Sequence, residues 1–386
     1  MNNAINNENK KLNVPNLRFK EFEGEWEYFL INDVCSEFKS GKNIKADSVF
    51  ECGEYPVYGG NGLRGYTSSY NHEGSYVLIG RQGALCGNVR SVYGKTYITE
   101  HAIAVAGNEK SNTNFLHYLF LKMNLGQYSD QSAQPGLAVN KLLKLKVALP
   151  IISEQTKIAK FLSLLDERIV TQNKIIEDLK KLKSAIIEKV FNGKHSEKLQ
   201  LNDVGSYIRG LTYSSNDVVE HGGTLVMRSN NIINGSLLDY NNNVVFVNKQ
   251  MSAEQQLQNG DVVICMANGS SSLVGKSSFY DGNCHSPITI GAFCGIYRSK
   301  EPIVKWLFQT NKYRRYIWNS LQGGNGAIAN LNGEDILNMS FSIPNATIKD
   351  TCVKMLTSVD SALENNMSLC ALYTLQKQHL LRQMFI

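Results

Sequence analysis

The segment IAKFLSLLDERIVTQNKIIEDLKKLKSAIIEKV, residues 158–190, decides the fold of this 386-residue chain. Its apolar positions step alternately by four and by three residues, a spacing typical of a coiled-coil seam and not of a globular helix face. The stretch 154–191 contains no Gly and no Pro, so nothing interrupts the predicted helix. The seam consists of Ile158, Leu162, Leu165, Ile169, Gln172, Ile176, Leu179, Lys183, Ile186 and Val190.

A second helix with the same pattern is predicted over residues 350–385, at an offset of 194 residues. Its polar interruptions fall at matching seam positions, because Asn366 corresponds to Gln172 and Lys377 to Lys183. Polar residues in a seam cost stability but fix register and partner. The second seam consists of Cys352, Leu356, Val359, Leu363, Asn366, Cys370, Tyr373, Lys377, Leu380 and Met384.

The ends of both helices carry local signals. Ser153 and Thr347 suit N-cap positions, Asp350 would complete a capping box, and Gly193 suits the end of the first helix. At 1.5 Å per residue, positions 158–190 extend roughly 50 Å, about one and a half turns of DNA. We therefore expect the two helices to pair antiparallel as a spacer. The alternative is that each helix packs separately on its own domain.

The remainder of the chain is also duplicated. Residues 30–34 recur at 200–204, an offset of 170, and residues 74–80 recur at 260–266. The block 136–140 recurs at 326–330, while Pro150, Asp166 and Phe191 match Pro344, Asp360 and Phe385. The offset grows from 170 to 194 because the middle of each half differs while its ends keep register. A scaffold with a variable insert fits this pattern.

Each half combines two regions of different amino-acid composition. A region rich in Gly, Asn, Ser, Tyr and Val precedes a helix rich in Lys, Glu, Leu and Ile. The predicted fold class is α+β, with two tandem mixed α/β domains in pseudo-twofold symmetry, separated by two long helices that form an antiparallel coiled coil. The predicted N-terminal arm is residues 1–27. The predicted domains are residues 28–150 and 199–344, and the predicted helices are residues 151–193 and 345–386.

Alternating apolar runs at 75–79 and 261–264 predict strands within these domains, joined by turns. Two shorter helices are expected at 114–125 and 303–321.

Composition narrows the class of protein. The net charge of +6 and pI of about 8.7 allow a polyanionic partner, held by local patches. The eight cysteines form no CxxC pair and the seven histidines no ligand spacing beside them, which favours reduced thiols and no metal site. Residues 1–11 are polar and no stretch reaches transmembrane length, so we expect a cytoplasmic protein without membrane contact.

Three motifs resemble catalytic ones but fail in detail. Residues 60–65 match GxGxxG, yet no helix and no acidic residue follow at the required distance. Residues 269–277 resemble a Walker A loop with five residues between the glycines, where four are needed. Asp33, Glu37 and Lys39 imitate a nuclease cluster but are crowded, which favours surface charge. We therefore expect no catalytic residues in this chain.

The middle part of each half, where the two copies differ, instead contains many side chains of the types that hydrogen-bond base edges and phosphates. Tyr58, Tyr66 and Tyr70 are interleaved with them, and any single member could equally be a solvated loop residue. The turn 81–83 is favoured because it follows a predicted strand and its equivalent, 267–269, is also polar. The predicted DNA-binding residues are Asn61, Arg64, Arg81, Gln82, Asn88, Arg90 and Lys95 in the first half, and Arg209, Arg228, Asn230, Asn231, Asn268, Ser270, Ser271, Ser272 and Lys276 in the second.

Over nearly its whole length the chain resembles the specificity subunit of type I restriction–modification enzymes. The resemblance lies in residues 15–19 with Trp26, in 55–59, and in the Leu-Pro-Ile-Ile-Ser-Glu-Gln stretch, 149–155, that leads into the first helix. The second copy of that stretch, 343–349, lacks the Glu-Gln pair.

The resemblance implies two target-recognition domains that each read one half-site of a split double-stranded DNA sequence. It also implies that the helices set the gap and dock two modification subunits, which methylate adenine with S-adenosylmethionine. Two restriction subunits using ATP and Mg would join for cleavage, so this chain itself would need no cofactor.

Three other functions stay open at this point: a stand-alone DNA-binding regulator, a divergent nuclease or methyltransferase, and a protein-only coiled-coil adaptor. The half-site sequences, the gap length, the loop residues that contact bases and the chain's independence of partner subunits do not follow from the sequence.

Overall fold

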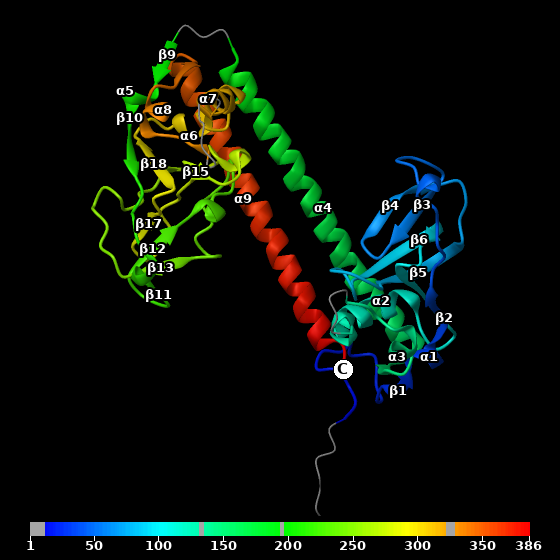
Figure 1. Cartoon of the computed structure of the whole chain (residues 1–386). Helices are drawn as coiled ribbons and strands as arrows, with labels where there is room; N and C mark the ends of the chain where they lie inside the picture. Colours follow the sequence, from blue (N-terminus) through cyan, green and yellow to red (C-terminus); the bar gives the residue numbers. More distant parts are fainter. Residues whose placement is uncertain (1–11, 131–134, 194–196, 322–328) are drawn as a thin grey trace, which may run out of the picture. The chain divides into compact units, whose positions relative to one another are not determined.

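The computed structural model of the chain describes residues 12–130, 135–193, 197–321 and 329–386. The chain forms two compact units: unit 1 is Met1–Asn173 with Ser368–Ile386, and unit 2 is Lys174–Met367. Each unit contains one mixed α/β domain and one half of each long helix, α4 (Ile152–Phe191) and α9 (Ala346–Gln383) (Figure 1). Two mixed domains and two long helices are the architecture that the sequence predicts.

Unit 1 is built on a six-stranded sheet in the order β2-β7-β5-β6-β3-β4. Neighbouring strands run antiparallel, except that β3 and β6 are parallel. The predicted strand 75–79 lies inside β5. The strands are β2 (Cys35–Ser40), β3 (Tyr55–Gly59), β4 (Gly62–Thr67), β5 (His72–Gly80), β6 (Val89–Ile98) and β7 (Ala102–Gly107).

Shorter elements complete unit 1. Strand β1 pairs antiparallel with β8, which brings the start of the domain beside the start of α4. These elements are β1 (Glu27–Leu30), α1 (Ile31–Val34), η1 (Ala46–Ser48), η2 (Leu125–Tyr128), α3 (Val139–Leu142) and β8 (Lys146–Leu149).

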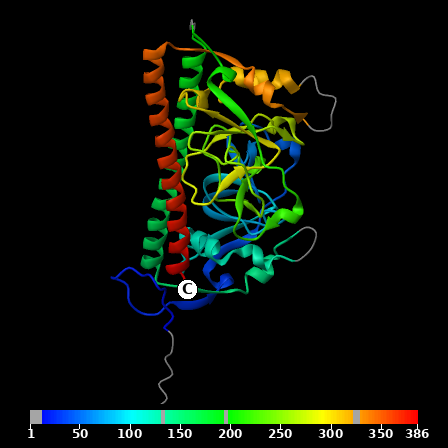
Figure 2. The same ribbon diagram turned by 90° about the vertical axis from the view of Figure 1, so that its left-hand side faces the viewer.

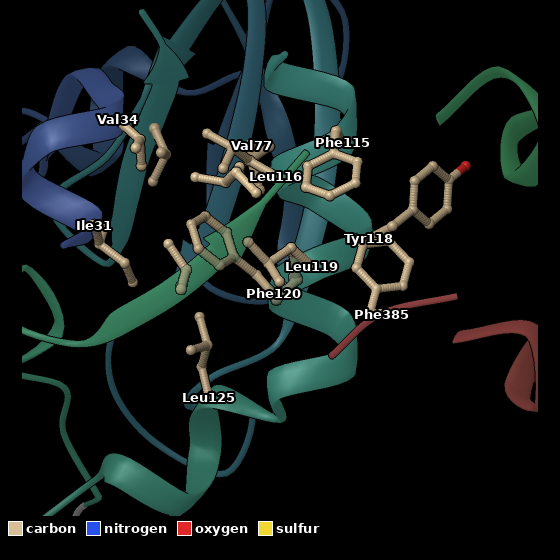
Figure 3. Packing of buried hydrophobic residues seen from close by; sticks show 14 of the residues in the cluster. Ile31, Val34, Val77, Phe115, Leu116, Tyr118, Leu119, Phe120, Leu125 and Phe385 are labelled. Atoms are coloured by element: carbon tan, nitrogen blue, oxygen red, sulfur yellow. The ribbon is translucent and has the colours of Figure 1, made fainter. Parts of the chain in front are cut away.

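Helix α2 (Thr113–Met123) supplies much of the core of unit 1. The Asn112 side chain caps it by accepting bonds from two backbone N–H groups, and Asn124 ends it by adopting a left-handed φ of 50°. The helix therefore begins and ends slightly earlier than the predicted 114–125. Its Phe115, Leu116 and Phe120 are fully buried, and Figure 3 shows these side chains within the core.

Phe385, which follows α9, completes this core from a distant part of the sequence. Its ring lies 5.1 Å from that of Phe115 between centroids (Figure 3). The centroid of the Trp26 ring lies 6.4 Å from that of Phe385. The backbone N–H of Leu17 donates to the carbonyl of Gln383 at 2.9 Å. Residues that precede the first strand and residues that follow the last helix thus share one core.

Unit 2 contains two four-stranded sheets, in the orders β10-β18-β14-β16 and β11-β13-β12-β17. The predicted strand 261–264 is found as β14, shifted by one residue. The strands of these sheets are β10 (Gly205–Arg209), β11 (Val218–Val219), β12 (Thr224–Met227), β13 (Val245–Val247), β14 (Val262–Cys265), β16 (Ser277–Phe279), β17 (Ile288–Ile290) and β18 (Cys294–Ser299).

The other elements of unit 2 repeat features of unit 1. Strand β9 pairs with β20 as β1 pairs with β8, and each first strand continues into a one-turn helix, α1 or α5, at the duplicated sequence. They are β9 (Glu197–Gln200), α5 (Leu201–Val204), η3 (Ser215–Asp217), η4 (Ser229–Asn231), β15 (Ala267–Asn268), η5 (Ser271–Leu273), α6 (Val304–Leu307), α7 (Asn311–Leu321), β19 (Ala329–Asn330), α8 (Gly333–Leu337) and β20 (Ser340–Ile343). Most of the duplicated block 326–330 lies outside the described residues.

The single helix predicted over 303–321 is wrong, because the chain forms α6 and α7 with a break between them. Thr310 lies in the break, and its hydroxyl accepts from the backbone N–H of Tyr313 at 3.1 Å. A hydroxyl that binds a backbone N–H in this way starts a new helix.

Both long helices are present, and every predicted seam residue is buried or half-buried. The predicted N-caps are wrong. Helix α4 already begins at Ile152, so Ser153 lies inside it, and α9 begins at Ala346, where the Asn345 side chain accepts from the N–H of Ile348. No helix in the described part of the chain combines the length and hydrophobicity needed to cross a lipid bilayer.

Within each unit the two helix halves run antiparallel and contact one another (Figures 1 and 2). In unit 1, Lys377 of α9 forms an ion pair with Asp166 of α4, and the Tyr118 hydroxyl donates to the same carboxylate at 2.8 Å. We call these three residues the unit 1 triad. They join both helices to α2 of the domain.

Unit 2 repeats this arrangement with the helices exchanged. Lys183 of α4 lies 2.7 Å from Asp360 of α9, and the Trp306 indole N–H donates to that carboxylate at 3.0 Å. We call Lys183, Asp360 and Trp306 the unit 2 triad. Asp360 is Asp166 displaced by 194 residues, and Lys377 is Lys183 displaced by the same number. The duplication thus preserves a charge pair as well as the helix.

Candidate nucleic-acid interface

Three turns of unit 1 meet at one end of its sheet. They join β3 to β4, follow β5, and join β6 to β7. The backbone N–H of Arg81 donates to the carbonyl of His101 at 2.9 Å, and a Cβ added to Gly60 would lie 2.8 Å from that carbonyl. We call residues 59–64, 80–90 and 99–101 the unit 1 loop cluster.

The unit 1 loop cluster brings together six of the seven residues predicted in the first half. Asn61, Arg64, Gln82, Asn88 and Arg90 are exposed and Arg81 is half-buried. Gly62 has a φ of +103°, and a Cβ there would lie 3.0 Å from the Arg90 guanidinium carbon, so Arg90 reaches across the hairpin turn. Three guanidinium groups and three side-chain amides therefore lie on neighbouring turns.

Lys95 does not join this cluster. It lies opposite Glu73 toward the other end of the β5–β6 pair, and its ammonium lies 4.9 Å from the centre of the Tyr70 ring. Lys95 and Arg90 are five residues apart in the sequence, and an extended strand separates such positions by roughly 16 Å.

His101 was missed by the sequence analysis. Its Nδ1 lies 3.3 Å from Oε1 of Gln82, and the side chain is exposed. The duplication contained no signal for it, since only the fold brings the β6–β7 turn beside the turn after β5.

Unit 2 forms a comparable set of turns. The Asn268 amide donates to the Ser229 hydroxyl at 3.3 Å, and the N–H groups of Met266 and Ala267 donate to the carbonyl of Phe293. We call residues 227–231, 266–276 and 291–293 the unit 2 loop cluster. The turn after β14 corresponds to the turn after β5, and each pairs with a later segment, through Asn268–Ala329 and Gln82–Gly136.

Within the unit 2 loop cluster, Arg228, Asn230, Ser270, Ser271 and Ser272 are exposed. Asn268 and Lys276 are half-buried on the same loop, and Arg209 lies exposed at the end of β10, opposite Gly295 of β18. Tyr213, Arg228 and Phe293 line a cavity of about 400 Å³. Tyr213 and the exposed Phe293 were not predicted from the sequence.

Asn231 has a structural role in place of the predicted contact with DNA. Its exposed fraction is 1%. Its amide donates to the carbonyls of Asp239 and Asn242 at 2.9 and 2.7 Å, while its oxygen accepts from the N–H of Arg228. All its hydrogen bonds are therefore used within the turn, and we leave it out of the interface.

The stretch that leads into α4 has a structural explanation. Glu154 is fully buried and accepts two bonds from the Arg18 guanidinium, at 2.8 and 2.7 Å. Gln155, also fully buried, donates to the carbonyls of Lys110 and Pro150 and accepts from the N–H of Asn112. Arg18 belongs to the 15–19 motif, so two motifs far apart in sequence bind one another.

The structure does not support a nuclease cluster at Asp33, Glu37 and Lys39. Glu37 is half-buried and accepts from His72 at 2.9 Å, with Lys39 at 3.2 Å. Burial opposes its ionisation, but the hydrogen bonds from His72 and Lys39 outweigh burial and lower the pKa of the Glu37 carboxyl. Among the described residues, no three His, Cys, Asp or Glu side chains meet in a metal-binding group.

The two glycine-rich motifs also take other conformations. Residues 62–67 form strand β4 directly after the turn, where a dinucleotide loop would start a helix. Residues 269–277 pass through the short turn η5 into strand β16. Neither presents a helix N-terminus to a phosphate.

Comparison with known proteins places this fold in a class. Residues 23–181 match the family model of the type I restriction modification DNA specificity domain. The type I restriction enzyme EcoprrI specificity subunit of Escherichia coli is 40% identical over 173 residues, 44% of this chain and 42% of that protein. The EcoKI specificity subunit of Escherichia coli K12 is 33% identical over 158 residues, covering 38% of this chain and 31% of that one.

The matching part of the chain is therefore similar to type I restriction–modification specificity subunits, as the sequence resemblance indicates. The matched segments span less than half of these curated relatives. The fold extends further: the S subunit of the type I system from M. genitalium superposes with a TM-score of 0.69 at 15% identity, covering 97% of this chain and 99% of that one.

Proposed function

We propose that this chain is the non-catalytic subunit that gives a type I restriction–modification complex its DNA sequence specificity, with each unit reading one half-site. The observation that carries the proposal is the gathering of Arg81, Gln82, Asn88 and Arg90 on turns at one end of the unit 1 sheet, inside the segment that matches the specificity domain. Arginine reads guanine, and Asn and Gln read adenine, through paired hydrogen bonds.

The second unit supports a two-part target because its own loop cluster offers Arg228, Asn230, Asn268 and Ser270 on equivalent turns. Long helices that join both units would set the gap between half-sites, through the antiparallel pairing of their seams. The same helices would dock two modification subunits that use S-adenosylmethionine, with two restriction subunits using ATP and Mg added for cleavage.

An exchange of residues 199–344 with those of a related specificity subunit tests this proposal. We expect the methylated sequence, read from the methylome of a host that also makes the modification subunit, to change in one half-site only. The reciprocal exchange of residues 28–150 is the control and should change the other half-site.

Two outcomes would contradict the proposal. If both half-sites change in either exchange, the units do not read independently. If the purified chain methylates or cuts DNA without partner subunits, the chain is itself an enzyme.

A further inference from the structure

Helix α7 of unit 2 has one face in the core and one face that is exposed among the described residues. Tyr313 and Ile317 are buried, whereas Arg314 is exposed and Trp318 has an exposed fraction of 64%. Arg314 and Trp318 are four residues apart and thus lie on the same side of the helix. A tryptophan exposed to this extent beside a cation is typical of a binding surface.

The exposed face of α7 forms one wall of a groove of about 410 Å³. Its floor is apolar, with Val274 and Ile317, and its rim carries Lys276, Arg314 and the Ser271 and Ser272 side chains. No acidic residue lines the groove, and within the described residues neither Lys276 nor Arg314 forms an ion pair. The groove therefore offers two uncompensated positive charges.

The groove is continuous with the unit 2 loop cluster. The loop that supplies Ser271 and Lys276 begins at Asn268, whose side chain binds Ser229 on the Arg228 turn. A ligand that contacts Arg228 and Asn268 can thus extend along this loop to Arg314.

We propose that this groove, which we call the α7 groove, binds the sugar–phosphate backbone of DNA beside the second half-site. The inference rests on the proposed function and adds a contact to it. Guanidinium, ammonium and hydroxyl groups are the usual ligands of DNA phosphates, and an aromatic face packs against the deoxyribose. Phosphate contacts fix the position of a protein on the duplex and carry no sequence information.

Unit 1 has a different structure at the corresponding place. After α2, which bears the aromatic residue of its triad, the chain forms the short turn η2 (Leu125–Tyr128) in place of an eleven-residue helix. The α7 groove thus belongs to the second half-site, and the first half-site serves as an internal reference.

Substitution of Arg314 tests the proposal in the full chain bound to its modification subunits. We expect Arg314→Ala to weaken binding of the target duplex about tenfold near 0.1 M salt and to reduce the slope of log K against log salt by about 1. Trp318→Ala should weaken binding without changing that slope. In both variants the two half-site sequences in the methylome stay the same.

The matched control is Arg315→Ala, which removes the same charge from an exposed position of α7 that does not line the groove. It should bind DNA as the wild type does. A duplex with neutral methylphosphonates flanking the second half-site should bind wild type and Arg314→Ala equally, whereas the same replacement beside the first half-site should preserve their difference.

Several results would overturn the proposal. An equal loss in Arg315→Ala would show a diffuse charge effect, and an altered second half-site would show base reading. If Arg314→Ala or Trp318→Ala left DNA affinity unchanged but abolished binding of the modification subunit, the α7 groove would be a protein-docking site. Failure of the wild-type complex to bind any specific duplex would refute the proposed function itself, and is thus distinguished from failure of the groove.

Discussion

At the scale of single residues, similar side chains have different roles because their surroundings differ. Asn230 and Asn231 are adjacent, and both were predicted to contact DNA bases. Asn230 is exposed, whereas the side-chain amide of Asn231 donates to two backbone carbonyls. The sequence predicted the polar turns but not which amide bonds inward, because that depends on the loop's own hydrogen bonds. His101 was missed for the same reason, since its neighbour Gln82 is 19 residues away.

His117 on α2 gives a prediction about pH. Burial, aided by the nearby Lys377 ammonium and opposed by Asp166, lowers the pKa of His117 to about 4. The unfolded chain holds this imidazole near 6.5. Folding therefore favours the neutral ring, so its contribution to stability is complete above pH 6.5 and is lost as the pH falls from 6.5 toward 4.

The measurement is urea unfolding of wild type and His117→Gln at several pH values between 7 and 4. We expect the wild type to lose on the order of 2 kcal/mol more than the variant across this window. Parallel profiles for the two proteins would show that His117 is not held neutral by the fold.

At the scale of elements, the long helices were the most predictable part of the chain. An apolar period of 3.5 over five heptads predicts a long helix with one apolar face, and every seam position is buried or half-buried. The short elements were harder, because the break between α6 and α7 depends on one threonine hydroxyl and not on periodicity. Nor did the sequence predict the triads: Lys183 was recognised as a polar interruption, whereas its partners Asp360 and Trp306 come together only in the fold.

The two triads predict that the same Asp→Asn substitution destabilises one unit more than the other. Asp360→Asn leaves the Lys183 ammonium, 7% exposed, without its counter-ion and should destabilise unit 2 by about 3–5 kcal/mol. Asp166→Asn should cost unit 1 less, because the Lys377 and Asp166 side chains are 20% and 32% exposed. Circular dichroism of the full chain during denaturant unfolding monitors both changes.

Equal costs at the two positions would contradict the assignment of the difference to burial. Burial lowers the pKa of the Lys183 ammonium, which Asp360 opposes, so Asp360→Asn should also make unfolding of unit 2 more sensitive to pH above neutrality.

At the scale of the whole molecule, the duplication predicted two domains and two helices, but not how the sequence is divided among cores. Unit 1 draws Leu380, Met384 and Phe385 from a segment that the sequence assigned only to a spacer helix. The apolar pattern of that segment is satisfied by a helix seam and by a domain core alike, so periodicity does not distinguish them.

Phe385 gives the prediction at this scale. Phe385→Ala removes a ring with a 3% exposed fraction and should destabilise unit 1 by about 3–5 kcal/mol. Its neighbour Ile386, 37% exposed, is the matched control, and Ile386→Ala should change stability by less than about 0.5 kcal/mol. Limited proteolysis should then cut unit 1 of the Phe385 variant first; equal resistance of both variants would contradict the shared core.

The shared core has a consequence for the order of events during synthesis. Residues 12–173 leave the ribosome before any of residues 174–367, and only afterwards do Leu380 and Phe385 appear. At ~5–20 residues per second this interval lasts roughly 10–40 s, during which Trp26 and Phe115 have no ring from Phe385 to cover them. The half of the molecule that is made first is therefore the half whose core is completed last.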